Sequence, residues 1–135
     1  MQDLHELPAI WFERVWNQKD ESAIDEMLES EYKAYGLGPV MTCAEDFKIF
    51  HRAYLQAFPD LHFVVDHVIA EGEWTSTRIT AAGTHQGDLN GIAPTNNRIS
   101  VTGIIMARWR NGRLIEAHNS VDMLGLLQQL GVPIG

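Results

Sequence analysis

The chain has 135 residues and a formal net charge of -8. This length predicts one domain over residues 1–135, and no apolar run approaches the roughly 20 residues of a membrane-spanning helix. The acidic balance and the scattered basic residues argue against a nucleic-acid partner. Residues 1–6 lack the basic and apolar regions of a signal peptide, so we expect a cytoplasmic protein.

A single cysteine, Cys43, excludes an internal disulfide and a cysteine-rich zinc site. It could be a nucleophile, but its place at the start of a predicted helix favours a small buried side chain. The histidines are spread along the chain, and strand alternation would turn His62 and His67 to opposite faces. We therefore expect no metal site.

Two amphipathic helices open the chain. Apolar residues recur at helical spacing through residues 4–18, with Pro8 in the first turn, where its missing N–H costs little. A second, shorter helix can be capped by Asp20 or Ser22 and should end near Ser30. The chain is then extended and aromatic as far as Gly36.

A third helix is predicted between Thr42 and Phe58. Thr42 and Glu45 have the spacing of a capping box, in which the hydroxyl and the carboxylate each accept a free backbone N–H. Aromatic residues follow at helical spacing, and Pro59 ends the helix because proline disfavours the helical conformation in the residue before it.

From Leu61 onward the apolar residues alternate with a period of about two, as in strands. The strands are expected at residues 61–70, 74–84, 98–110 and 113–121. Asn111-Gly112 is a strong hairpin signal because both turn residues need a positive φ. Three helices, four long antiparallel strands and a terminal helix predict an α+β fold, with the helices on one face of a curved sheet.

Two groups of polar residues are candidates for chemistry. His85 lies between Gly83 and Gly87 where a strand breaks into a loop, and it could carry a proton or simply hydrogen-bond the loop. Asp122 could act with a histidine as acid and base, but its position before the terminal helix favours a cap. Alternation implies that if Asn119 points inward, His118 points outward.

Five ordered motifs resemble the SnoaL-like polyketide cyclases, also called ester cyclases. They lie at residues 58–61, 83–87, 91–95, 111–116 and 122–131. The resemblance implies the cone-shaped α+β fold of nuclear transport factor two, with N-terminal helices on the concave face of a curved antiparallel sheet and a deep apolar pocket between them. It also implies a homo-oligomer, a dimer or tetramer, formed through the sheet.

The resemblance also implies a reaction. In the characterised cyclases an aspartate on the last strand acts as acid and base in an intramolecular aldol closure, assisted by a histidine on the preceding strand, without metal or cofactor. Anchoring on the motifs places Asn119 at the aspartate position and Ile105 at the histidine position. An amide has no proton-transfer pKa near neutrality, so Asn119 can polarise a carbonyl but cannot serve as the base.

Three hypotheses follow for a hydrophobic ligand in this pocket. The chain is an enzyme of the cyclase, isomerase or hydrolase type that uses His85 or Asp122, a non-catalytic binding protein, or a cofactor-independent hydroxylase accessory. The candidate catalytic residues are His85, Asn119 and Asp122. The residues expected to contact the ligand are Trp16, Tyr32, Tyr35, Ile105, Ala107, Ala117 and His118.

Overall fold

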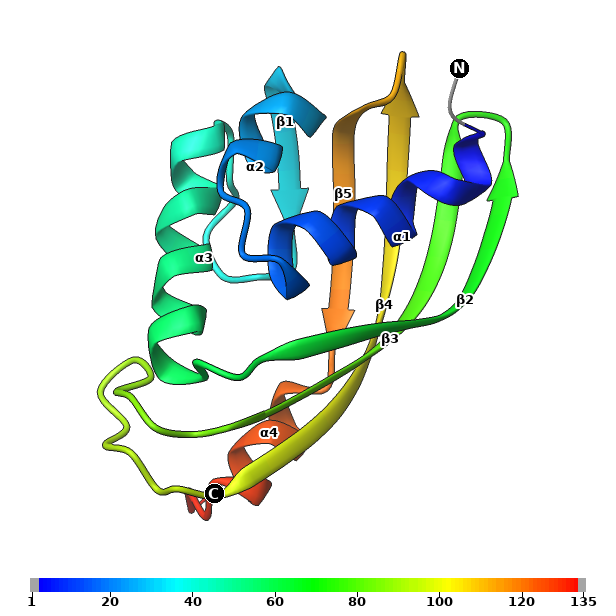
Figure 1. Cartoon of the computed structure of the whole chain (residues 1–135). Coiled ribbons are helices and arrows are strands. Elements are labelled where there is room, and N and C mark those ends of the chain that lie inside the picture. Colours follow the sequence, from blue (N-terminus) through cyan, green and yellow to red (C-terminus); the bar gives the residue numbers. More distant parts are fainter. Residues whose placement is uncertain (1–2, 134–135) are drawn as a thin grey trace.

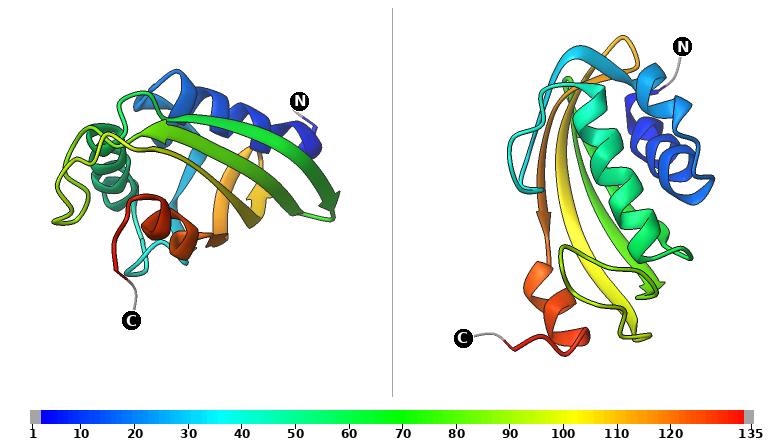
Figure 2. Two further views of the ribbon diagram at one scale, coloured as in Figure 1. Left: turned by 90° about the horizontal axis from the view of Figure 1, so that it is seen from below. Right: turned by 90° about the vertical axis from the view of Figure 1, so that its left-hand side faces the viewer.

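The computed structural model describes residues 3–133 and shows a curved sheet with helices gathered on one face (Figures 1 and 2). The ends of the predicted domain, residues 1–2 and 134–135, lie outside the described part, and with them part of the predicted N-terminal segment. The elements are η1 (Leu4–Glu6), α1 (Leu7–Trp11), η2 (Phe12–Asn17), α2 (Ser22–Met27), β1 (Leu28–Tyr35), α3 (Ala44–Ala57), β2 (His62–Glu71), β3 (Trp74–Thr84), β4 (Arg98–Arg110), β5 (Arg113–Val121) and α4 (Met123–Gln129).

The sheet has five strands in the order β1-β5-β4-β3-β2. Antiparallel pairing joins β2 to β3, β3 to β4 and β4 to β5, whereas β1 runs parallel to β5. The α+β fold is as predicted, but the expectation of four antiparallel strands was incomplete. Residues 28–35 form a fifth strand, so the second helix ends at Met27 rather than near Ser30.

The hairpin between β4 and β5 turns at Asn111 and Gly112, with φ values of 54° and 75°. This is the turn that the Asn-Gly pair predicts. The first helical segment is also close to its predicted bounds, because η1, α1 and η2 follow one another from Leu4 to Asn17. None of the helices in residues 3–133 is long and apolar enough to cross a membrane.

The predicted capping box of Thr42 and Glu45 at the start of α3 is wrong, because neither residue makes its expected bond. Cys43 is the N-cap residue and makes no side-chain cap bond. The backbone N–H of Thr42 donates to the carboxylate of Asp46 at 2.9 Å, and this bond is the main reason that the pKa of Asp46 is lowered. Glu45 instead faces Arg52, with 3.7 Å between the charged atoms.

A β-bulge corrects the expected orientation of two histidines. The pairing of β2 with β3 shifts between Val65 and His67, so the alternation of β2 changes phase at Asp66. His62 and His67 are consequently both exposed, on the same face of the strand. At about 3.3 Å per residue they are still roughly 16 Å apart, too far to share a metal ion.

Candidate functional site

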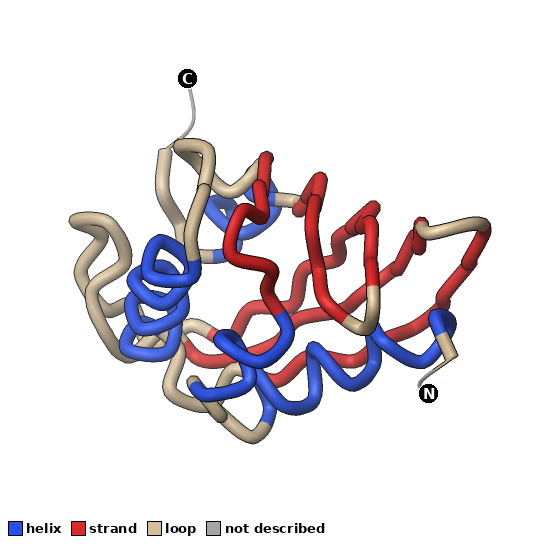
Figure 3. Tube along the Cα trace, turned by 90° about the horizontal axis from the view of Figure 1, so that it is seen from above, coloured by secondary structure: helices blue, strands red, loops and turns tan. Residues whose placement is uncertain are grey.

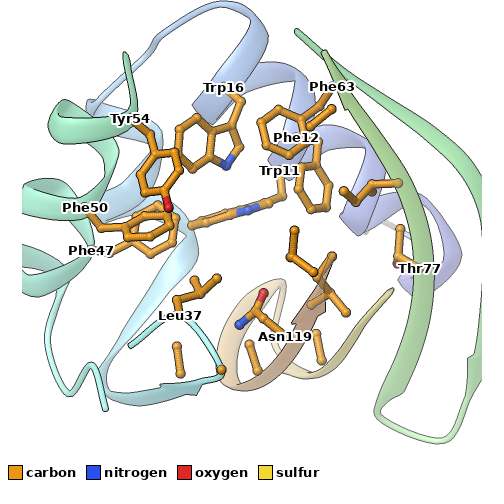
Figure 4. A pocket seen from close by; sticks show the side chains of 18 of the residues that line it. Trp11, Phe12, Trp16, Leu37, Phe47, Phe50, Tyr54, Phe63, Thr77 and Asn119 are labelled. Atoms are coloured by element: carbon orange, nitrogen blue, oxygen red, sulfur yellow. The ribbon is translucent and has the colours of Figure 1, made fainter. Parts of the chain in front are cut away.

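A cavity of about 350 Å³ lies between the helices and the concave face of the sheet (Figure 4). The tube view of Figure 3 shows the curved sheet, with helices across from its concave face. The residues that line the cavity include Trp11, Phe12, Trp16, Tyr32, Leu37, Phe47, Phe50, Tyr54, Phe58, Phe63, Thr75, Thr77, Ile79, Ile105, Ala107, Trp109, Leu114, Ala117, Asn119 and Leu126.

Aromatic rings from two helical segments form one wall. Trp11 and Trp16 come from the first segment, in which Gln18 donates its backbone N–H to the carbonyl of Glu13 in an i→i+5 bond. This wider π-type turn brings residues five apart close to one face, so both indoles can face the sheet. Phe47 of α3 packs edge-on against both, with ring centroids 5.2 Å and 6.0 Å away.

The sheet supplies the opposite wall, mostly with small or aliphatic side chains. Ile105, Ala107 and Ala117, three of the residues expected to contact a ligand, line the cavity. Thr75 and Thr77 add two buried hydroxyls from β3, and Thr75 accepts a 2.9 Å hydrogen bond from the indole N–H of Trp109. The wall is therefore apolar except for a few hydroxyls and one amide.

That amide belongs to Asn119. Its Nδ2 donates to the backbone carbonyl of Tyr35 at 3.0 Å, which ties β5 to the end of β1. Gly36 makes this approach possible, since a Cβ there would overlap the backbone carbonyl oxygen of Asn119. Figure 4 shows the amide projecting into the cavity beneath the aromatic wall.

Two tyrosines of the lining are in their neutral form at ordinary pH. Burial raises the pKa of Tyr32, with a further contribution from the negative charge of Asp46, and burial also raises the pKa of Tyr54. The hydroxyl of Tyr32 is buried without a hydrogen-bond partner among the described residues. Neither phenol can therefore supply a base near neutral pH.

Tyr35 and His118 lie outside the cavity lining, although both were expected to contact a ligand. Their rings stack with centroids 4.9 Å apart, on the opposite face of the sheet from Asn119. His118 also bonds the carboxylate of Glu116 at 2.6 Å. The reason is the one-residue alternation of the strand, which turns His118 outward because Asn119 points inward.

His85 is fully buried but is likewise not part of the cavity lining. Its Nδ1 accepts the backbone N–H of Thr95 at 3.2 Å and lies 3.0 Å from the Thr95 hydroxyl. Because Nδ1 is an acceptor, the neutral ring carries its proton on Nε2. Close backbone packing accompanies it, since a Cβ at Gly87 would overlap the carbonyl oxygen of Gln56. Of the two roles considered for His85, proton carrier and hydrogen-bond partner of the loop, these contacts match the second.

Asp122 caps the terminal helix, which was the favoured interpretation of its position. Its carboxylate accepts the backbone N–H of Gly125 at 2.8 Å, and its side chain is exposed. Of the three candidate catalytic residues, only Asn119 lines the cavity. The described lining contains no aspartate, glutamate, histidine, lysine or arginine.

The candidate contacts inferred from the sequence omitted much of the aromatic wall. Phe47, Phe50 and Tyr54 recur at helical spacing, which predicts a helix but does not show that these rings border a cavity. Thr75 and Thr77 could have been found from the sequence by another pattern. They are polar residues at alternate positions of an otherwise apolar strand face, which indicates hydroxyls directed toward the core.

The family model of the SnoaL-like polyketide cyclases matches residues 8–130. The chain belongs to this family. Its motif resemblance is thereby confirmed, as is the fold like that of nuclear transport factor two. A search of curated proteins gave no significant match.

Solved structures agree with this membership. AclR of Streptomyces galilaeus, provisionally described as a hydroxylase, is 30% identical with a TM-score of 0.82, and the alignment covers 98% of this chain and 86% of AclR. IdmH of Streptomyces antibioticus, provisionally described as a polyketide cyclase, is 25% identical with a TM-score of 0.83, over 97% of this chain and 100% of IdmH. A SnoaL-like protein of Jannaschia sp. CCS1 shares the fold at 19% identity, with a TM-score of 0.87 over 99% and 100% of the two chains.

Proposed function

We propose that this SnoaL-like protein binds a hydrophobic, largely aromatic small molecule in the cavity between its helices and its sheet. The observation that carries the proposal is the character of the lining, which is aromatic and aliphatic with a few hydroxyls and two amides, those of Asn90 and Asn119. Ligand pockets of proteins commonly measure about 300–1,000 Å³ and are mostly apolar with few polar groups. A cavity of about 350 Å³ suits a ligand of two or three fused rings.

The same lining argues against proton transfer by a carboxylate or an imidazole. The position at which the resemblance places the catalytic aspartate is Asn119, and the position of the histidine is Ile105, so neither titrates. His85 and Asp122 already serve the loop and the helix. Binding without aldol chemistry is therefore the proposed function.

A direct test is calorimetric titration with a tricyclic anthraquinone methyl ester. We expect saturable binding to the wild type and loss of binding in Ala117→Trp, because the indole would fill the cavity. Ser120→Trp is the matched control, since Ser120 lies on the same strand and is exposed. Absence of binding to the wild type, or equal binding by both variants, would contradict the proposal.

The second candidate is an enzyme of the cyclase type, favoured by family membership and by the descriptions of AclR and IdmH. Cyclisation of the same ester should be followed by absorbance for the wild type and for Asn119→Asp. Turnover by the Asp variant alone would mean that the cavity keeps the shape of a cyclase without its base. Turnover by the wild type would replace the binding proposal with catalysis.

A homodimer is the second part of the proposal, and it rests on the family resemblance. The face of the sheet opposite the helices carries Ile104 and Met106, which are 50% and 48% exposed. Exposed apolar side chains grouped on a sheet face are commonly covered by a partner.

A further inference from the structure

The orientation of the Asn119 amide is set by one contact. Nδ2 donates to the Tyr35 carbonyl at 3.0 Å, and an exchange of the amide nitrogen and oxygen would bring two acceptors together with no proton between them. The amide oxygen is therefore the atom left for the cavity, and Figure 4 shows it on the side of the aromatic wall. No donor among residues 3–133 bonds to it.

The opposite wall offers donors. Trp11 and Trp16 are buried, and neither indole N–H has an acceptor within the described part of the chain. Trp109 differs, because its N–H is bonded to Thr75. An indole N–H that borders an apolar cavity without a protein acceptor can donate to a bound ligand. Figure 4 shows Trp11 and Trp16 bordering the same space as Asn119.

We propose that these groups determine specificity through hydrogen-bond polarity. Asn119 is a fixed acceptor, and it selects ligands with a neutral hydroxyl or N–H donor on the side that faces the sheet. Trp11 and Trp16 select ligands with a carbonyl or similar acceptor on the side that faces the helices. The inference rests on the proposed binding function and adds that the ligand is uncharged, since the described lining holds no charged side chain to pair with an ion.

Four planar tricyclic probes separate these effects: fluorene, fluorenone, hydroxyfluorenone and methoxyfluorenone. Calorimetry gives the dissociation constant of each with the wild-type chain. A hydrogen bond to a buried group is worth about tenfold in affinity, so we expect fluorenone to bind about tenfold more tightly than fluorene. Hydroxyfluorenone should exceed its methyl ether by a similar factor, because the ether has no proton to donate.

Variants assign each preference to its residue. Asn119→Leu should remove the preference for the hydroxyl over the ether and keep that for fluorenone over fluorene. Asn97→Leu is its matched control, since Asn97 also donates from its amide to a backbone carbonyl, that of Gln129 at 3.0 Å, away from the cavity. Trp11→Phe or Trp16→Phe should reduce the ketone preference, whereas Trp74→Phe, outside the lining, should not.

The outcomes separate the inference from the proposed function. If none of the four probes binds, binding itself fails. If all four bind wild type equally, binding stands and the assignment of polarity is overturned. This comparison uses only the wild-type chain, so it remains decisive if Asn119→Leu does not fold. A hydroxyl preference that survives in a folded Asn119→Leu would also overturn the role of Asn119.

Discussion

At the scale of single residues, the position of Asn119 is set by its neighbours on β1 as much as by its own strand. The carbonyl of Tyr35 holds the amide, and the absence of a side chain at Gly36 lets the two strands approach. Alternation along β5 predicts only that Asn119 and His118 point to opposite faces of the sheet. It does not reveal which backbone group orients the amide.

Replacement of Gly36 by alanine tests this dependence. Gly36 has a φ of +93°, and a Cβ there would overlap the carbonyl oxygen of Asn119. We expect Gly36→Ala to lower the free energy of unfolding by about 3 kcal/mol, from left-handed strain and the clash together. Urea denaturation measures the change.

Gly38→Ala is the matched control. Gly38 also has a positive φ, +107°, but no neighbouring atom lies within 4 Å of the place that a Cβ would take. It should cost only about 1–2 kcal/mol, from backbone conformation alone. Equal losses for the two variants would show that the contact with Asn119 contributes nothing.

Asp60 is expected to give acid-dependent stability. Its carboxylate accepts the backbone N–H of Thr84 at 2.7 Å, and this bond is the largest cause of a pKa below the ordinary value of 3.8. A lowered folded-state pKa stabilises the fold fully above the unfolded value and is lost as the pH falls through the folded value. The stability difference between wild type and Asp60→Asn should therefore shrink below about pH 4.

Urea midpoints measured from about pH 6 down to about pH 3 check this behaviour. Glu71→Gln is the control, because Glu71 is exposed at the end of β2 and its side chain has no hydrogen bond within residues 3–133. A constant difference between wild type and Asp60→Asn over the whole range would contradict the prediction.

At the scale of elements, local signals determine where most helices and strands begin and end. The bounds of β3, β4 and β5 agree with the predicted ranges, and Asn111-Gly112 makes the expected turn. The π-type turn of η2 was not foreseen, because its apolar spacing is also compatible with an α-helix. That turn places Trp16 in the aromatic wall.

The cap of α4 gives a prediction at this scale. Asp122→Ala should lower the free energy of unfolding by about 1 kcal/mol, because the N–H of Gly125 loses its acceptor. Asp122→Asn should change it by only a few tenths of a kcal/mol, since an amide oxygen also caps a helix. Urea denaturation measures both, and binding of the anthraquinone ester should be unaffected.

Asp88→Ala is the comparison for Asp122→Ala, because it also removes a carboxylate that accepts a backbone N–H. Asp88 accepts that of Gly91 at 3.0 Å, but in a loop rather than at a helix. If Asp122→Asn were as damaging as Asp122→Ala, the charge of Asp122 would matter more than its oxygen as an acceptor. If Asp122→Asn abolished turnover of a substrate, the catalytic hypothesis for Asp122 would regain support.

At the scale of the whole molecule, the two faces of the sheet have different roles. The concave face borders the cavity, and the other face carries Ile104 between Arg78 and Ser120 of the neighbouring strands. If this outer face joins two chains, a charge at Ile104 would be buried without a partner and would oppose association.

We expect sedimentation equilibrium to give twice the chain mass for the wild type and a shift toward monomer for Ile104→Glu. Ile49→Glu is the matched control, since Ile49 is 59% exposed on α3, away from the sheet. A wild type that is monomeric at micromolar concentration, or equal dissociation by both variants, would contradict association through the outer face.

The sequence by itself determined the α+β class, the family and the bounds of most elements. These depend on local periodicity, on turn residues such as Asn111-Gly112 and on motifs that follow one another along the chain. The family resemblance named Ile105, Ala107, Ala117 and Asn119 as candidate site residues, and all four line the cavity. Their role in binding a ligand stays a prediction.

Only the tertiary structure decided the rest. The parallel pairing of β1 with β5 joins segments about 80 residues apart, as in Ala34 opposite Ala117, and no local pattern encodes such a partner. The bulge at Asp66 changes the strand phase, which period-two counting cannot detect. For His85, the sequence left two roles open, and the folded chain decides between them by placing the ring against the Thr95 backbone and outside the cavity lining.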